Sequence, residues 1–210
     1  MQTDLFITKL KEELNKELPG EQYQELMSSP YRYRHELPAG EPQNGSVIVL
    51  VYPSGGSFNT VLIERSVDNT VHSGQISLPG GKIEECDNFP RDTALRELAE
   101  EVHVEQEDVR ILGCLTALYI PASNYYVMPF VGSIDYKAAF MANPQEVHEI
   151  IEAPIEQLAR PENISTIIIK YKDSVIDAPC YTIGRHKVWG ATAMILSEFL
   201  EVVRRTAFFV

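Results

Sequence analysis

Three glutamates stand close together near the middle of the chain: Glu97, Glu100 and Glu101. On a helix, spacings of three and four residues bring side chains onto neighbouring positions, so these carboxylates would converge. Repulsion between exposed like charges at that spacing costs only about 0.2–0.5 kcal/mol per pair, so an ordinary solvated acidic face would also explain them. Converging carboxylates are equally the hard oxygen ligands of a Mg²⁺ or Mn²⁺ site that acts on phosphates.

A helix over Pro90–His103 is predicted to carry these glutamates. Proline suits the first turn of a helix, and four apolar residues at helical spacing form a stripe that would face a core: Ala94, Leu95, Leu98 and Val102. Gly80, Gly81 and a long loop precede the helix. Because backbone carbonyls of such a loop can join carboxylates as metal ligands, the context favours the metal site over the solvated face.

The rest of the pattern predicts an α/β fold of the α+β type. Helical spacing over residues 3–18 and 21–27 and a Pro- and Gly-rich stretch define an N-terminal helical arm and linker, residues 1–44. Residues 45–210 form the main domain. Its predicted elements are a hairpin over 46–66, a long loop over 68–89, strands at 109–120, 125–134 and 146–154, a short helix at 154–159, a hairpin over 165–183 and a closing helix over 188–206. This irregular mixture predicts a mixed β-sheet with helices on its faces.

Composition narrows the possible functions. The 210 residues carry a formal net charge of -12, which argues against nucleic acid or an anionic membrane as the main partner. The N-terminal residues lack the uninterrupted apolar region of a secretory signal. The three cysteines form no CxxC pair and suit a reducing compartment, so we expect a cytoplasmic protein. An acidic protein that acts on a phosphate ester would need metal ions to mediate the contact.

The segment Gly81–Val104 resembles the Nudix box, G-x5-E-x7-R-E-U-x-E-E-x-G-U, in which U is aliphatic. The matching residues are Gly81, Arg96, Glu97, Leu98, Glu100, Glu101 and Val104. Asp87 stands in place of the first box glutamate, and eight residues rather than seven separate it from Arg96. His103 replaces the glycine that ends the helix, where it would adopt a left-handed conformation at modest strain.

The resemblance implies a role for each matching residue. The implied metal ligands are three carboxylates and one backbone carbonyl: Glu97, Glu100, Glu101 and Gly80. Arg96 and Asp87 are implied to form an ion pair that orients the loop and the helix. A surface pair between Arg96 and Glu100, four residues apart, is the alternative for Arg96. The resemblance also implies the Nudix fold, a mixed β-sheet sandwiched between helices, and Mg²⁺ or Mn²⁺ as the cofactor.

The residues before the box resemble the coenzyme A pyrophosphatase branch, which carries L-L-T-x-x-S/A-x3-R-x3-G-x3-F-P-G-G. The agreeing positions are Leu62, Ser66, Gly74, Pro79, Gly80 and Gly81. Ile63 replaces the threonine, Leu78 replaces the phenylalanine conservatively, and Thr70 stands where the branch has an arginine. Near the other end, Val188–Leu196 resembles the W-G-x-T-A helix start of this branch. The resemblance implies coenzyme A or acyl-CoA as the substrate. Because Thr70 replaces the arginine of this branch, an ADP-sugar or NADH pyrophosphatase is the alternative.

Several residues in these segments are candidates for contact with the substrate. The candidate set is Ser66, His72, Gln75 and Gly81. A packed or capping role is the alternative for His72. Trp189, the only tryptophan, is predicted to be a core residue that packs against the last helix. Tyr125 and Tyr126 either stack on adenine or belong to a half-buried strand.

Hydrolysis also needs a general base that activates water. The candidates are a carboxylate of the box helix, Glu100, and a carboxylate outside it, Glu146, with Glu149 second. The alternative is that Glu146 and Glu149 are surface charges beside a strand. Together with Arg96, Glu100 and Glu146 form the predicted catalytic set.

The sequence thus predicts a Nudix pyrophosphohydrolase that splits a small-molecule nucleoside diphosphate derivative. The implied products are 3',5'-ADP and 4'-phosphopantetheine or its acyl form. A regulatory Nudix domain that binds a nucleotide without catalysis is one rival, although such domains usually lose the box carboxylates that are present here. A structural domain with an acidic face is another. Whether residues 1–44 mediate a homodimer stays open.

Overall fold

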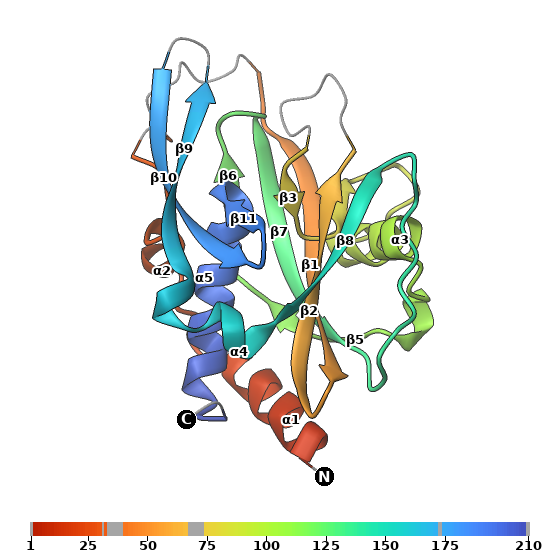
Figure 1. The fold of residues 1–210 in the computed structure, drawn as a ribbon. Helices are drawn as coiled ribbons and strands as arrows, with labels where there is room; N and C mark the ends of the chain where they lie inside the picture. Colours follow the sequence, from red (N-terminus) through yellow and green to blue (C-terminus); the bar gives the residue numbers. More distant parts are fainter. Residues whose placement is uncertain (1, 31, 33–39, 67–73, 172–173, 209–210) are drawn as a thin grey trace.

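The computed structural model describes residues 2–30, 32, 40–66, 74–171 and 174–208 (Figure 1). Its helices are α1 (Gln2–Leu14), α2 (Glu21–Glu25), α3 (Pro90–Val102), α4 (Ile155–Leu158) and α5 (Gly190–Arg205), with 3₁₀ turns at Gln106–Asp108 and Pro161–Asn163. Its strands are β1 (Gln43–Ser54), β2 (Ser57–Arg65), β3 (Ile76–Ser77), β4 (Gly80–Lys82), β5 (Arg110–Cys114), β6 (Leu118–Ile120), β7 (Tyr125–Ser133), β8 (Val147–Pro154), β9 (Ile164–Tyr171), β10 (Ser174–Ile183) and β11 (His186–Trp189). The predicted mixture of strands and helices is confirmed.

The main sheet is mixed and contains eight of these strands. Its central path is β3-β2-β1-β7-β5, while β4 pairs with β1, β6 with β7 and β8 with β2. The pairing of β1 with β7 is parallel, and the other pairings are antiparallel. A second sheet of three strands, in the order β11-β10-β9, stands apart from the first (Figure 1). The sequence predicts the β9–β10 hairpin but does not reveal that it forms a separate sheet.

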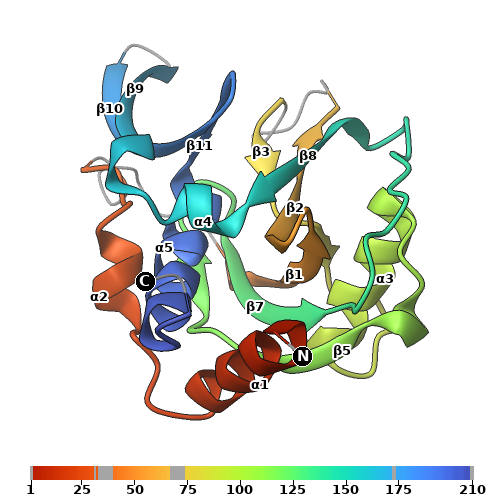
Figure 2. The ribbon, with the colours of Figure 1, turned by 60° about the horizontal axis from the view of Figure 1, so that its bottom comes forward.

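Helices cover both faces of the main sheet, as predicted. Alternation along β1 assigns its side chains to two cores: Ile48, Leu50 and Tyr52 pack with α3, whereas Val49 and Val51 pack with α1 and α5. This period of two is what a strand buried on both faces requires. Figure 2 shows α3 on one side of β1 and β7 and α5 on the other. The sheet is therefore sandwiched between helices.

Some element boundaries differ from the prediction. Helix α1 ends at Leu14 instead of residue 18, and Asn15 and Lys16 continue as turns. The last helix begins at Gly190 instead of Val188, because Val188 and Trp189 pair with β10 as part of β11. The predicted long loop before α3 contains two short strands, β3 and β4, and the span 109–120 divides into β5 and β6.

The N-terminal helices lie against the last helix and the edge of the sheet. Phe6 and Leu10 of α1 are fully buried, and Gln24 of α2 donates a hydrogen bond to Glu198 of α5. Within the described part of the chain, no helix combines the length and apolar composition needed to cross a membrane. The division at residue 44 remains a prediction.

Candidate active site

Helix α3 positions the box glutamates against the turn that precedes it. Pro90 opens the helix, and the carboxylate of Asp92 accepts a hydrogen bond from the backbone N–H of Phe89 at 3.0 Å. The helix ends at His103, which has a φ of 57° and so adopts the predicted left-handed conformation. Both ends are therefore fixed, and the face that carries Glu97 and Glu101 turns toward β4.

Glycines 80 and 81 make room for two of the carboxylates. The backbone N–H of Gly80 donates a hydrogen bond to Glu101 Oε2 at 2.9 Å. A Cβ atom on Gly81 would lie 2.2 Å from Glu97 Oε1, so any larger residue would displace that carboxylate. Gly80 has a φ of 151°, and a Cβ atom there would lie 2.3 Å from the carbonyl oxygen of Ser46. The double glycine is thus sterically required next to the two glutamates.

Three carboxylates converge at this point: those of Glu97, Glu101 and Glu146, with ligand oxygens within 4.8 Å of one another. Glu146 lies just before β8, and its backbone carbonyl accepts a hydrogen bond from Ser66 N–H at 2.9 Å. We call Glu97, Glu101 and Glu146 the carboxylate cluster. Glu100 lies outside it, with a side chain that is 48% exposed and hydrogen-bonded to Arg96 Nη1 at 3.1 Å.

The cluster is electrostatically unfavourable without a cation. Glu101 is fully buried, and its Oε1 atom has no hydrogen-bond partner. Burial first, and then the neighbouring Glu97 and Glu146, raise the pKa of Glu101 to about 8, against the opposing effects of Gly80 N–H and Arg65. Burial also raises the pKa of Glu97. Buried carboxylates whose charges are only partly compensated fit a divalent cation, because Mg²⁺ and Mn²⁺ take oxygen ligands.

Arg96 forms the predicted ion pair with Asp87. Its Nε and Nη2 atoms donate to the two carboxylate oxygens at 3.2 and 3.1 Å, and Nη2 also reaches the carbonyl of Lys82 at 3.2 Å. The Arg96 guanidinium lowers the pKa of Asp87 to about 2. Arg96 Nη1 contacts Glu97 and Glu100 as well, so the surface pair considered for it is also present. The hydrogen bonds of the Arg96 guanidinium therefore connect the loop before α3 to the helix.

A cleft of about 980 Å³ opens beside the cluster. Glu97 and Glu146 line it, together with Gly80, Gly81 and Gln75. Its other walls come from β6, β7, the three-stranded sheet and the start of α5. Their apolar lining residues include Ile120, Val127, Ile169, Ile176, Met194 and Ile195. The carboxylates therefore stand at one side of a cleft whose remaining walls are largely apolar.

The structure brings some of the other predicted contacts to this cleft. Gln75 lines it, whereas Ser66 is not among its lining residues and instead donates a backbone hydrogen bond to Glu146. Tyr125 lines the cleft, whereas Tyr126 is 47% exposed and is not among its lining residues. His72 and Thr70 lie outside the described residues. Trp189 was predicted to be a core residue, but it is half-buried and lines the cleft, because β11 carries it there before α5 begins.

Arg65 is a residue that the sequence patterns did not single out. It ends β2, lines the cleft and lies 3.6 Å from Glu101 Oε1 through its Nη1 atom. A charged residue at the end of an apolar strand, fifteen positions before the double glycine, is the signal that could have found it. Its charge partly offsets the buried carboxylate.

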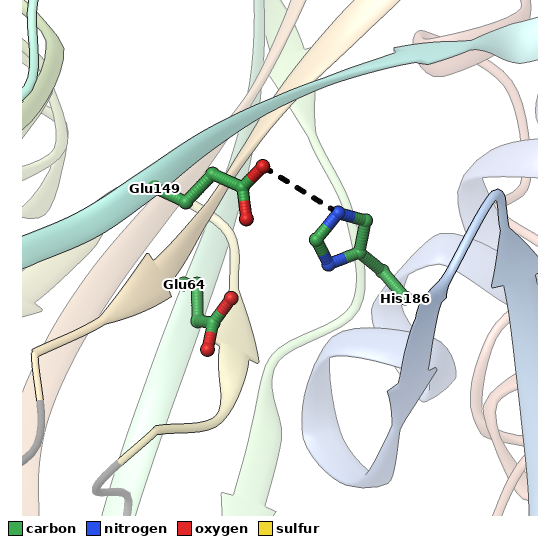
Figure 3. A group of neighbouring side chains, drawn as sticks. All are labelled: Glu64, Glu149 and His186. Carbon is green, nitrogen blue, oxygen red and sulfur yellow. Dashed lines mark ion pairs between the residues drawn. The ribbon is translucent and has the colours of Figure 1, made fainter.

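A second group of possible metal ligands lies at the junction of the two sheets. Figure 3 shows Glu64 of β2, Glu149 of β8 and His186 of β11 facing one another. His186 Nε2 lies 3.7 Å from Glu149 Oε1, and Arg185 Nη2 donates to Glu149 Oε2 at 2.6 Å. Arg185 already pairs with Glu149, so we interpret the group as a polar bridge between the sheets. Glu149, the second candidate for the general base, belongs to this bridge.

Comparison with known proteins identifies the class. Residues 41–170 match the description of the NUDIX domain. Nudix hydrolase 22, chloroplastic, of Arabidopsis thaliana is 30% identical over 200 residues, which cover 92% of this chain and 63% of the plant protein. The Nudix hydrolase NudL of Pectobacterium atrosepticum is 33% identical over 138 residues, 66% of this chain and 71% of that protein. The chain belongs to the Nudix family.

A solved structure supports the fold independently. The crystal structure of MutT protein from Methanosarcina mazei Go1 superimposes with a TM-score of 0.52 at 16% identity, covering 80% of this chain and 97% of that one. At this identity the likeness concerns the fold alone. The likeness confirms the predicted Nudix fold, while family membership and the Nudix hydrolase relatives confirm the predicted enzyme class, a Nudix pyrophosphohydrolase. The chain spans less than two thirds of the length of the Arabidopsis relative.

Proposed function

We propose that the protein hydrolyses the pyrophosphate bond of coenzyme A or acyl-CoA and releases 3',5'-ADP and 4'-phosphopantetheine or its acyl form. The observation that carries the reaction is the carboxylate cluster at the side of the cleft, with Glu101 buried and one of its oxygens unpartnered. The coenzyme A assignment rests on the residues before the box and on the W-G-x-T-A segment. The apolar walls of the cleft support it, since they suit an elongated substrate with a weakly polar arm.

Glu97 and Glu101 would hold Mg²⁺ or Mn²⁺, with Glu100 and the Gly80 carbonyl as the further ligands that the family resemblance implies, and the carboxylate of Glu146 lies beside them. A bound divalent cation neutralises the negative charge that develops on the phosphate oxygens during hydrolysis. Arg96 acts as a positioning residue, because it holds Asp87, Glu97 and the loop carbonyl of Lys82 in one network. It thereby keeps the loop next to the helix.

The general base accepts the proton of the water molecule that attacks one phosphorus atom, as the bond to the bridging oxygen breaks. We assign this role to Glu146 ahead of Glu100. Glu146 lines the cleft next to Glu97, whereas the Glu100 carboxylate is bonded to Arg96. At the end of β2, the backbone N–H of Ser66 donates a hydrogen bond to the backbone carbonyl of Glu146, and the Arg65 guanidinium lies next to the Glu101 carboxylate.

Substrate profiling tests the proposal. The purified protein is incubated with Mg²⁺ or Mn²⁺ and, separately, with coenzyme A, acetyl-CoA, ADP-ribose, NADH and dinucleoside polyphosphates, and the products are separated by chromatography. We expect 3',5'-ADP from coenzyme A with the highest kcat/KM. Turnover of ADP-ribose or NADH without turnover of coenzyme A would replace the assigned substrate and leave the enzyme class intact. A Glu146→Gln variant with full activity would remove Glu146 from the base role.

A further inference from the structure

The hydroxyl of Ser77 is a polar group on the wall of the cleft that makes no hydrogen bond to the described residues. Ser77 lies in β3 and lines the cleft, while its Oγ atom is shielded from solvent. In the described part of the chain, the hydroxyls of Thr60 and Ser123 share this property. Buried polar groups in folded proteins almost always have a hydrogen-bond partner, because an unpaired one destabilises the fold. An unpaired hydroxyl beside a cleft therefore points to a partner that the cleft itself receives.

The pairing of β3 places Ser77 beside the carboxylate cluster. Ser77 pairs with Ile63 of β2, and cross-strand partners carry their side chains on the same face of a sheet. Arg65, two residues after Ile63, lies on that face too, and its Nη1 atom is 3.6 Å from Glu101 Oε1. Three residues after Ser77, the backbone N–H of Gly80 donates to the same carboxylate. Ser77 therefore shares its sheet face and its short segment with the residues that contact Glu101.

The Ser77 hydroxyl is available for a ligand. Because no hydrogen bond to the described residues holds Oγ, rotation about the Cα–Cβ bond to another staggered position breaks none and can turn it into the cleft. Thr192 also lines the cleft, but its hydroxyl already donates to the backbone carbonyl of Ile76 at 3.0 Å, which fixes β3 against α5. Ser123 lies in the turn after β6, which β1 and β7 separate from β4. Ser77 is thus the hydroxyl that can serve a ligand at the cluster.

We propose that Ser77 binds the substrate by donating a hydrogen bond from its hydroxyl to a non-bridging oxygen of the pyrophosphate. The inference rests on the carboxylate cluster as the place of hydrolysis in the proposed function, and it holds for any substrate with a pyrophosphate, coenzyme A included. A hydrogen bond to an ionised oxygen is about twice as strong as one between neutral groups. A neutral hydroxyl forms no ion pair with Glu97 or Glu101, so it contacts the phosphate without competing with the metal ion.

Removal of the hydroxyl tests the contact. The kcat/KM of the substrate that is hydrolysed fastest is measured with Mg²⁺ for the wild type, Ser77→Ala and Thr60→Val. Thr60 is the matched control, because its hydroxyl is also buried and unpaired but the residue is not among those that line the cleft. We expect Ser77→Ala to lower kcat/KM by about tenfold to a hundredfold, as for the loss of a hydrogen bond to a charged group. Thr60→Val should stay within about twofold of the wild type.

Thermal unfolding distinguishes a binding role from a structural one. Neither variant should have a lower Tm than the wild type, because each change removes a hydroxyl that makes no hydrogen bond to the described residues. A Ser77→Ala variant whose kcat/KM stays within about twofold of the wild-type value would overturn the proposal. So would a loss of activity accompanied by a clear fall in Tm, since that would mean a structural role for the hydroxyl.

A binding measurement separates this inference from the coenzyme A assignment. Titration calorimetry with Mg²⁺ gives the Kd of imidodiphosphate, a pyrophosphate analogue whose P–N–P link resists hydrolysis, for the wild type and both variants. A Kd raised about tenfold in Ser77→Ala alone supports the contact even if coenzyme A is not hydrolysed. Equal Kd values for the wild type and Ser77→Ala, or no binding by the wild type, would refute the contact even if coenzyme A is the substrate.

Discussion

Among the residues that the structure describes, two glutamates are fully buried, and their surroundings differ sharply. Glu198 on α5 accepts hydrogen bonds from Gly20 N–H, the Gln24 amide and both the N–H and the hydroxyl of Thr116. Glu101 on α3 accepts one, from Gly80 N–H, and its other oxygen has none. A buried carboxylate that accepts several hydrogen bonds has a structural role, whereas a buried carboxylate that lacks them indicates a site for a bound ligand. Four predictions test this distinction.

The largest effect is expected at the under-bonded glutamate. Glu101→Gln should lower kcat by about a thousandfold, since one preorganised electrostatic group is worth that much in a charged transition state. Above about pH 8, the metal-free variant should be no less stable than the wild type, because the change removes a buried repulsive charge and keeps an acceptor for Gly80. Steady-state kinetics and thermal unfolding with EDTA measure both. Full activity, or a large fall in stability, would mean that Glu101 has a structural role like that of Glu198.

The opposite pattern is expected at the fully bonded glutamate. Glu198→Gln replaces an acceptor oxygen by an N–H donor that faces other donors, so the free energy of unfolding should fall by about 3 kcal/mol. The kcat of the folded fraction should stay within about twofold of the wild-type value, because Glu198 lies outside the cleft lining. Urea unfolding measures the free energy of unfolding, and kinetics corrected by active-site titration give the kcat of the folded fraction. A variant that is stable but inactive would contradict the scaffold role.

The raised pKa of Glu101 predicts a pH dependence of stability in the absence of metal. Its ordinary pKa is 4.5 and its folded-state pKa is about 8, so the folded state keeps a proton that the unfolded state loses. The contribution of Glu101 to stability must then decrease as pH rises from about 4.5 to 8 and level off above. Thermal unfolding across this range should show the decrease with EDTA, and saturating Mn²⁺ or Glu101→Gln should flatten it. An unchanged slope in the variant would assign the decrease to other groups.

The smallest effect is expected at the bridge between the sheets. Glu149 is partly exposed and has Arg185 and His186 as partners, so Glu149→Gln should change the free energy of unfolding by less than about 1 kcal/mol. Binding of Mn²⁺ to the protein, measured by calorimetry, should be unchanged within about twofold. If this variant bound one Mn²⁺ ion fewer than the wild type, the group of Glu64, Glu149 and His186 would be a metal site. Glu97→Gln serves as the positive comparison, because it should weaken Mn²⁺ binding.

The box helix and its carboxylates could be predicted because they depend on local spacing. Residues four apart on a helix differ by about 40° in direction, so Glu97 and Glu101 share the face toward β4. Glu100 is rotated away from Glu101 by about 100° and ends half-exposed, which spacing alone does not reveal. The Asp87–Arg96 pair was likewise predicted from the box and formed as expected.

Features that depend on distant parts of the chain were harder to predict. Glu146 could be suggested only by resemblance, and its place beside Glu97 and Glu101 follows from the pairing of β8 with β2. Trp189 reads as a helix residue because an apolar aromatic precedes a strong amphipathic pattern, but the ladder with Cys180 keeps it in a strand. The separate three-stranded sheet could not be predicted, since alternation tells which residues face inward but not which strands pair.

The parallel ladder between β1 and β7 also bears on how the protein folds. It joins residues 43–51 to residues 125–133, and α3 lies in the chain between them. Contacts so far apart in sequence form slowly, because the intervening chain must lose its freedom before the pairing stabilises anything. Glu97 and Glu101 lie on one helix, but Glu146 reaches them only when β8 pairs with β2. The carboxylate cluster is therefore a late product of folding, and a nascent chain has no assembled site until β8 is in place.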